Sequence, residues 1–293
     1  MRLRDYQVQA QLTDQIPRSN PDWLIVPLLG MAGEVGSLLV EYKKSLRDGP
    51  AHRLFKEHVA EELGDILWYL ANVASKFDLD LEAIASSNLA KTLDRWPTTS
   101  KKAAQTPHLF DDDYPAAQQL PRQFVASIEE VMGPVGRAQV VVSIDGHEVG
   151  ARIQDNAYDD DGYRFHDIFH LAHAAILGWS PVLRKLMGRK RKSSTTVDEV
   201  EDGGRAIVID EAIVAFVFDY ARRHNFLEGI DAVDYQLLKT VRGLVSGLEV
   251  STRTSYEWER AILVGYEIWR EIRERRGGVV EGDLVNQTLR VRS

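Results

Sequence analysis

The sequence of 293 residues contains no cysteine, so disulfide bonds, thiolate catalysis and cysteine-based zinc sites are all excluded. It also has no run of about 18 uninterrupted apolar residues, which a membrane-spanning helix would need. The first stretch, MRLRDYQVQAQLTDQ, lacks the apolar segment of a signal peptide. We therefore expect a soluble, unsecreted protein without a membrane segment, and a cytoplasmic location.

Positive charge is in deficit. Lys and Arg number 36 against 44 Asp and Glu, which gives a formal net charge of −8. An acidic surface argues against general binding to nucleic acid or membranes. A small anionic ligand stays open, because a bound metal ion reverses the local sign of charge. The hydrophobic share of 44% is enough for a sizeable core.

The hydrophobic pattern predicts a mainly α protein in two domains. Apolar residues recur at helical spacing through residues 1–97, with helices expected at about 27–47, 51–77 and 81–95. Residues 98–122 carry three prolines and no periodicity, so we expect a linker there. Residues 123–293 predict a second, mostly helical domain with a small β-hairpin in RAQVVVSIDGHEVGARI, turning at Asp145-Gly146.

Acidic residues face one another across the helices expected at 27–47 and 51–77. Glu62 and Asp65 are three residues apart and so share a helix face. The connection back to the helix of Glu34 is short, which predicts antiparallel packing. Carboxylates in a shared groove repel unless a cation bridges them, and oxygen ligands favour Mg²⁺ or Mn²⁺. The alternative is an ordinary solvated acidic face.

At this point the sequence resembles the MazG-like, all-α nucleoside triphosphate pyrophosphohydrolases. DYQVQAQLT resembles the opening helix of that family, and LLGMAGEVGSLLVEYKKSLRDG its first acidic helix. EELGDILWYLANVA matches the second acidic motif, E-x-x-D, and NLAKTLDRWP resembles the closing segment. The resemblance covers residues 1–97 and implies a helical nucleotide pyrophosphohydrolase domain that acts as a homodimer or higher homo-oligomer. The second domain resembles the C-terminal helical extensions of some bacterial members, which imply no particular activity.

The resemblance also implies a reaction. A nucleoside or deoxynucleoside triphosphate would be hydrolysed with Mg²⁺, or with Mn²⁺ as a substitute, to the monophosphate and pyrophosphate. It makes Glu34, Glu62 and Asp65 metal ligands and Glu61 an acid that orients water. Contacts to the substrate would come from Asn88, Lys91 and Arg95. Trp68 is a further candidate for stacking on the base, with core packing as the alternative. Nucleotide-pool control or sanitation would be the role.

Ser37 departs from the pattern, because the family has a carboxylate at this position. Glu41 lies two turns beyond Glu34 and could compensate as a metal ligand, or could instead pair with Lys43 or Lys44. If the missing acid weakens catalysis, two other functions remain. One is a nucleotide-binding regulator that keeps the fold; the other is an interaction protein whose helical bundle supplies an interface.

The second domain has its own group of histidines and acidic residues at helical spacing. His166 and His170 are four residues apart, a spacing found in metal sites on helices, with Asp167 beside them. Glu199 and Asp202 follow in VDEVEDGGR. These five residues form a candidate second site, against the alternative of polar residues bonded at a packing junction. The basic run GRKRKSS at 188–194 predicts a solvated loop, with phosphate contact as the lesser alternative.

Overall fold

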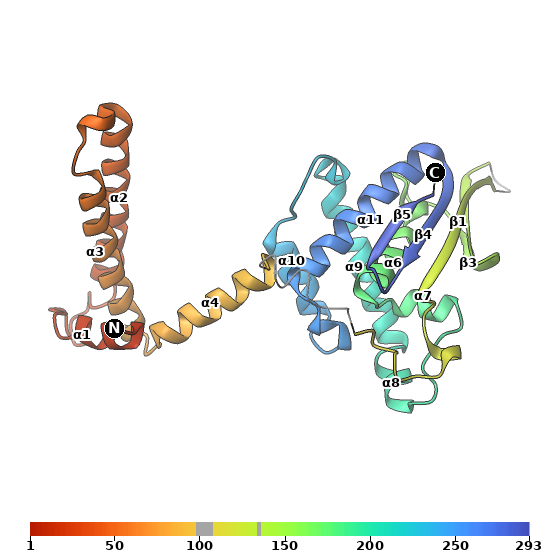
Figure 1. Ribbon diagram of the computed structural model, residues 1–293, viewed down its shortest axis with the longest axis horizontal. Coiled ribbons are helices and arrows are strands. Elements are labelled where there is room, and N and C mark those ends of the chain that lie inside the picture. Colours follow the sequence, from red (N-terminus) through yellow and green to blue (C-terminus); the bar gives the residue numbers. More distant parts are fainter. Residues whose placement is uncertain (98–107, 134–135, 293) are drawn as a thin grey trace. The chain divides into compact units, whose positions relative to one another are not determined.

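The computed structural model describes residues 1–97, 108–133 and 136–292. These residues form two compact units, Met1–Leu93 and Asp94–Ser293, and Figure 1 draws both. The first unit is helical. The second combines helices with a five-stranded sheet, so the prediction of a mainly α fold in two parts is confirmed.

The first unit is built on an antiparallel helix pair. Its helices are α1 (Leu3–Gln11), α2 (Ile25–Asp48), α3 (Phe55–Lys76) and α4 (Leu81–Arg95), with the 3₁₀ turn η1 (Gly49–Ala51) between α2 and α3. The helix expected from residue 51 begins instead at Phe55. Gly30 lets the two helices approach, because a Cβ there would lie 2.3 Å from the ring of Tyr69. The buried core of this unit is small and consists of Ala10, Ala71, Ala74 and Leu81.

Apolar surface remains open on the first unit. Of the 24 residues of α2, only Pro27 and Glu41 are buried. Its exposed apolar side chains include Leu39, Tyr42 and Leu46, which are 57–71% exposed and lie on one helical face. Within Ile25–Ala51 an 18-residue window has a mean hydropathy of 1.3, so this helix is long and apolar enough to span a membrane by length and composition alone. The core helix of a soluble protein meets the same criterion, although only 11% of this window is buried here. Exposed apolar surface of this kind is typical of an interaction site.

The second unit contains an antiparallel sheet in the order β3-β2-β1-β4-β5. The strands are β1 (Gln123–Met132), β2 (Ala138–Ile144), β3 (His147–Ile153), β4 (Gly277–Asp283) and β5 (Thr288–Val291). The predicted hairpin is β2–β3, and its turn residues Asp145 and Gly146 have φ of 49° and 82°, as a two-residue hairpin requires. The other three strands were not predicted.

Helices cover the sheet and fill the core of the second unit. In chain order they are η3 (Tyr163–Phe165), α6 (Asp167–Ala172), the π-helical turn η4 (His173–Leu177), α7 (Pro181–Leu186), α8 (Thr195–Val200), α9 (Gly204–Arg222), α10 (Tyr235–Leu244) and α11 (Ser255–Arg275). Helix α11 packs on α6, β4 and β5, as Figure 1 shows. Its Trp258 and Trp269 are fully buried, and together with α6 they form the centre of the core.

The chain turns directly from α11 into β4. Arg276 has a left-handed backbone, and Gly277 follows with φ of 139°. A Cβ at Gly277 would lie 2.6 Å from the carbonyl oxygen of Ile128 on β1, so only glycine allows β4 to approach β1 this closely. This turn therefore sets the register in which Gln123 on β1 pairs with Asp283 on β4.

The expected linker at 98–122 is wrong for its described part. Residues 98–107 lie outside the described residues, but from His108 the chain packs into the second unit. Leu109 and Leu120 belong to its core, at 4% and 2% exposed. Asp111 is 1% exposed and accepts hydrogen bonds from Arg184 and Arg122 at 2.8 and 2.7 Å. The run of acids in this segment is typical of a solvent-exposed linker. Its first member, Asp111, is instead buried and neutralised by Arg122 and Arg184.

The basic run at 188–194 also differs from the solvated loop we expected. Arg191 is 1% exposed, and its guanidinium donates to Asp202 at 2.8 Å and to Glu249 at 2.7 Å. Asp202 is equally buried and also lies 3.4 Å from Arg184. Burial works against the charge of Arg191, but these carboxylates raise its pKa above the ordinary value. Arg191 thus joins three segments of the second unit.

We predict that Arg191→Met destabilises the protein by about 3–5 kcal/mol, because it leaves the buried Asp202 carboxylate short of a partner. The free energy of unfolding from urea titration, followed by tryptophan fluorescence, measures the loss. The exposed neighbour supplies a control, since Lys192→Ala is expected to change stability by less than about 0.5 kcal/mol. An Arg191→Met protein as stable as the control would contradict this role.

Candidate functional site

Three of the predicted metal ligands meet between α2 and α3. Carboxylate oxygens of Glu34, Glu62 and Asp65 all lie within 4.8 Å of one another. Glu34 and Glu62 are partly buried, whereas Asp65 is exposed. Partial desolvation and then the charge of Glu34 raise the pKa of Glu62 above its ordinary value. Neighbouring carboxylates repel one another when they are ionised, so a site of this kind favours a bound cation.

The neighbours of this cluster bear on its chemistry. Glu61 is exposed on α3 next to Glu62, and its charge contributes to the raised pKa of Glu62. Ser37 is partly buried one turn beyond Glu34 on α2. It brings a neutral hydroxyl to the position where the family resemblance expects a fourth carboxylate. The cluster itself therefore has three carboxylates.

Glu41 does not join this cluster, so its proposed role as a compensating ligand is wrong. It is 6% exposed and belongs to a separate ion-pair group. Lys44 donates to one oxygen at 2.5 Å, while ring nitrogens of His52 and His58 lie 3.0 Å from the other. Hydrogen bonds from Lys44 and the histidines lower the pKa of Glu41 to about 2, against the effect of desolvation. The alternative, in which Glu41 pairs with Lys44, is therefore the one observed.

The three candidate substrate contacts on α4 are separated by the fold. Asn88 and Lys91 line a surface hollow of about 440 Å³ beside Ile84. Arg95 instead belongs to the second unit, where it donates to the carbonyl of Val233 at 2.8 Å. Our prediction that Arg95 contacts substrate together with Asn88 and Lys91 is therefore wrong, because its guanidinium is already bonded within the second unit.

Trp68 is placed by packing. It lies against the small core of the first unit, and its indole N–H donates to the hydroxyl of Thr13 at 2.8 Å. Its ring meets that of Tyr69 edge-on, with centroids 5.0 Å apart. These contacts favour the core-packing alternative over stacking on a base.

The histidines of the second unit form a cluster at the start of α6. Donor atoms of His166, Asp167 and His170 lie within 4.8 Å of one another. Glu211 of α9 adds a carboxylate, with Oε2 3.4 Å from Nε2 of His170. Burial alone would lower the pKa of His170, but the charges of Asp210 and Glu211 raise it to about 10. The surroundings of this imidazole therefore favour positive charge.

Two predicted members of that cluster lie elsewhere. Asp202 is bonded to Arg191, as described above, and Glu199 lies on α8 rather than on the helices that carry the histidines. Glu211 takes their place. The i, i+3 spacing of Glu199 and Asp202 could not predict this, because Asp202 is bonded to Arg191 and not to the histidines.

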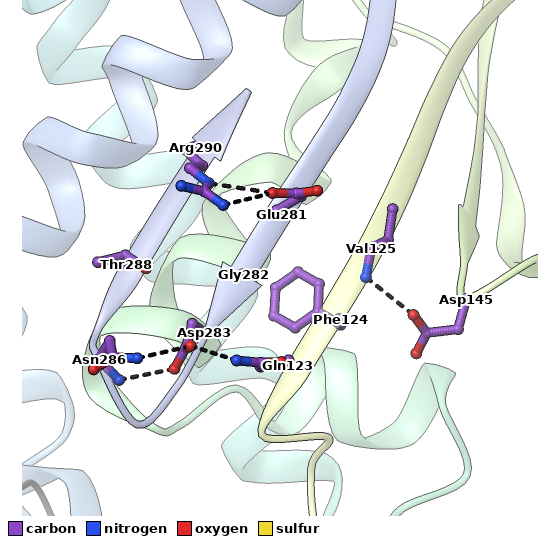
Figure 2. Close-up of a pocket in the computed structure, with 10 residues that line it drawn as sticks. All are labelled: Gln123, Phe124, Val125, Asp145, Glu281, Gly282, Asp283, Asn286, Thr288 and Arg290. Carbon is purple, nitrogen blue, oxygen red and sulfur yellow. Dashed lines mark hydrogen bonds and ion pairs between the residues drawn. The ribbon is translucent and has the colours of Figure 1, made fainter. Parts of the chain in front are cut away.

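A surface hollow of about 450 Å³ lies over strands β1, β4 and β5, and Figure 2 shows its lining. Its charged groups are all hydrogen-bonded to neighbouring residues. Asp283 accepts from Gln123 at 2.8 Å and from Asn286 at 2.9 Å, and Arg290 donates to Glu281 at 2.9 Å (Figure 2). These pairs satisfy the groups that a ligand would use, so the hollow gives no functional indication.

Comparison with known proteins adds two findings. Residues 105–293 match the model of a family described as MazG C-terminal domain. Gene 37 protein of Mycobacterium phage L5 is 31% identical to the chain over 101 residues, which is 32% of this chain and 89% of the phage protein. No solved structure matches the chain.

We predict that Glu41→Gln destabilises the protein at neutral pH but not in acid. A carboxylate whose pKa falls to about 2 on folding contributes stability above its ordinary value of 4.5. That contribution is lost as pH falls through 2, so the difference between wild type and variant should shrink from pH 5 downward. Urea titrations followed by circular dichroism across this range measure it. Glu57→Gln, at an exposed acid of α3, is the control, and a difference for Glu41→Gln that stays constant with pH would contradict the ion-pair role.

Proposed function

Since the chain belongs to the MazG C-terminal domain family, we propose that it is a nucleotide pyrophosphohydrolase whose catalytic centre lies in the first unit. Its substrate would be a nucleoside or deoxynucleoside triphosphate, with the monophosphate and pyrophosphate as products. The observation that carries the proposal is the meeting of Glu34, Glu62 and Asp65 within 4.8 Å on two packed helices.

The donor set fits a hard divalent cation. All three donors are carboxylate oxygens, the ligands that Mg²⁺ and Mn²⁺ prefer. Two of the three side chains are partly withdrawn from water, and desolvation, followed by repulsion from Glu34, raises the pKa of Glu62; a cation would relieve that repulsion. Such an ion would supply a neutralising charge for phosphate oxygens and a more acidic bound water.

The chain's own residues would divide the remaining work. Glu34, Glu62 and Asp65 hold the ion, while the exposed carboxylate of Glu61 accepts a hydrogen bond from the attacking water and orients it toward the α-phosphorus. No protein nucleophile is required for hydrolysis at that centre. Asn88 and Lys91, which line the hollow on α4, supply an amide and a positive charge for the substrate.

Ser37 favours one alternative. With a hydroxyl in place of a fourth carboxylate, the site has less negative charge to hold a second ion. A nucleotide-binding regulator that keeps the fold and turns over slowly is consistent with this. Either protein would act on the nucleotide pool of the cytoplasm, through sanitation in the first case and sensing in the second.

We also propose that the first unit works as a homodimer or larger homo-oligomer. Helix α2 packs on α3, yet only two of its 24 residues are buried, so most of its apolar surface stays exposed within the unit. The exposed face of Leu39, Tyr42 and Leu46 would bury apolar surface against a second copy. An interaction protein that used only this face would keep the assembly without any turnover.

Pyrophosphate release from eight common NTPs and dNTPs, with Mg²⁺ and then Mn²⁺, tests the enzyme. We expect Glu62→Gln to lower kcat/KM at least about 100-fold, since lost outer partners of metal ligands alone cost 10–100-fold. The control Glu57→Gln removes the same charge from an exposed site on α3, so this variant should keep its activity. Metal-dependent nucleotide binding without turnover would favour the regulator, and absence of both binding and turnover would overturn the proposal.

Self-association is measured by sedimentation equilibrium of the full chain. We expect wild type to sediment as a dimer or larger and the double variant Leu39→Lys/Leu46→Lys as a monomer with unchanged circular dichroism, because two charges cannot be buried in an apolar interface. Val208→Lys, at a 65% exposed site in the second unit, is the matched control. A monomeric wild type at all concentrations would refute the assembly.

A further inference from the structure

We propose that His166, Asp167, His170 and Glu211 form a second metal site, which binds a Zn²⁺-class divalent ion in the second unit. The site is independent of the proposed pyrophosphohydrolase centre. It lies on different elements and has a different donor chemistry. Two imidazoles with two carboxylates favour a transition metal, whereas the three carboxylates of the first unit favour Mg²⁺.

The distances between donor atoms match a metal coordination sphere. Nε2 of His166 lies 3.8 Å from Oδ1 of Asp167 and 3.9 Å from Oε2 of Glu211. Nε2 of His170 lies 3.4 Å from the same oxygen of Glu211. Ligands at about 2.0–2.2 Å around a tetrahedral ion are about 3.3–3.6 Å apart. These three separations lie close to that range, and the donor atoms of His166, Asp167 and His170 all lie within 4.8 Å of one another, so modest side-chain shifts would be needed to bring all four donors onto one ion.

His170 gives independent support, because a buried imidazole needs partners. It is 1% exposed, and among the described residues neither of its ring nitrogens has a hydrogen-bond partner. Its contacts of 3.1 Å to Asp210 and 3.4 Å to Glu211 lack hydrogen-bond geometry. A buried polar group without partners is costly, and a metal ion on Nε2 would remove that cost.

Outer partners prepare both histidines as ligands. Nδ1 of His166 lies 2.9 Å from the carbonyl of Tyr163, so this nitrogen carries the proton and leaves Nε2 free to bind a metal. Nδ1 of His170 lies 3.1 Å from Oδ1 of Asp210 without hydrogen-bond geometry, and turning the ring onto a metal ion at Nε2 would complete a carboxylate–histidine–metal arrangement. Asp210 is fixed in turn, because it accepts from Ser180 at 2.7 Å and lies 2.9 Å from Nδ1 of His173.

The site is reachable and joins two helices. Glu211 has a 44% exposed side chain, so an ion can enter from that side, while His166 and Asp167 are only 13% exposed. Three ligands come from the start of α6 and the fourth from α9. With four protein ligands the site is of the closed, structural kind, and the ion would clamp α6 to α9.

Isothermal titration of the chelator-treated full chain with Zn²⁺, in excess Mg²⁺ to occupy the acidic cluster of the first unit, tests the proposal. We expect one tightly bound Zn²⁺ per chain and a thermal melting temperature that rises with it. Affinity should fall at least about 100-fold in His166→Gln and in His170→Gln. It should not change in the control His224→Gln, at an exposed histidine outside the cluster.

Two other groups must be separated from this one, because Glu41, His52 and His58 lie within metal-binding distance of one another, and so do His170, His173 and Asp210. Loss of Zn²⁺ in His58→Gln or in His173→Gln but not in His166→Gln would overturn the proposal, as would a wild type that binds no Zn²⁺.

If the cluster variants do not fold, anomalous diffraction from Zn²⁺-loaded wild type decides the question. A peak within ligand distance of His166 and Glu211 supports the site, and a peak elsewhere, or none, refutes it.

Discussion

A carboxylate that leaves water must meet positive charge, and this constraint organises both units. In the second unit Asp111 meets Arg184, Asp202 meets Arg191, and Asp210 faces His170 and His173. These pairs join segments far apart in the chain and hold the helices over the sheet. In the first unit the carboxylates divide into two groups. Glu41 is neutralised by its own neighbours, whereas no ion pair to Glu34, Glu62 or Asp65 is found among the residues that the structure describes.

The two groups of carboxylates in the first unit differ in the direction of their pKa shifts. A neutralised carboxylate has a lowered pKa, as at Glu41, and serves stability. A carboxylate beside other acids has a raised pKa, as at Glu62, and keeps its charge at a cost in free energy. The same distinction applies to the imidazoles of α6. His173 contacts Asp210 with good geometry, while His170 lacks hydrogen-bond partners for both nitrogens among the described residues.

Local spacing predicted what local geometry decides. The first-unit helices, the β2–β3 hairpin and the meeting of Glu62 with Asp65 and Glu34 follow from helical period, a turn dipeptide and a short connection. The failures share one cause, namely partners distant in sequence. Arg95 bonds to a carbonyl 138 residues away, and β4 pairs with β1 at a separation of 160 residues from Gln123 to Asp283. The segment RGGVVEGD does not by itself predict a strand, because β4 forms only by pairing with β1.

This late pairing has a consequence for synthesis of the chain. Strand β1 has a neighbour in β2 soon after it leaves the ribosome, but its other edge stays open until Gly277–Asp283 has been made. The second unit thus cannot complete its sheet during most of translation, whereas the first unit emerges early and is built from helices alone. Nascent chains on one messenger would therefore present the apolar face of α2 to one another before their sheets close. In such a protein, assembly between chains can precede the folding of each chain.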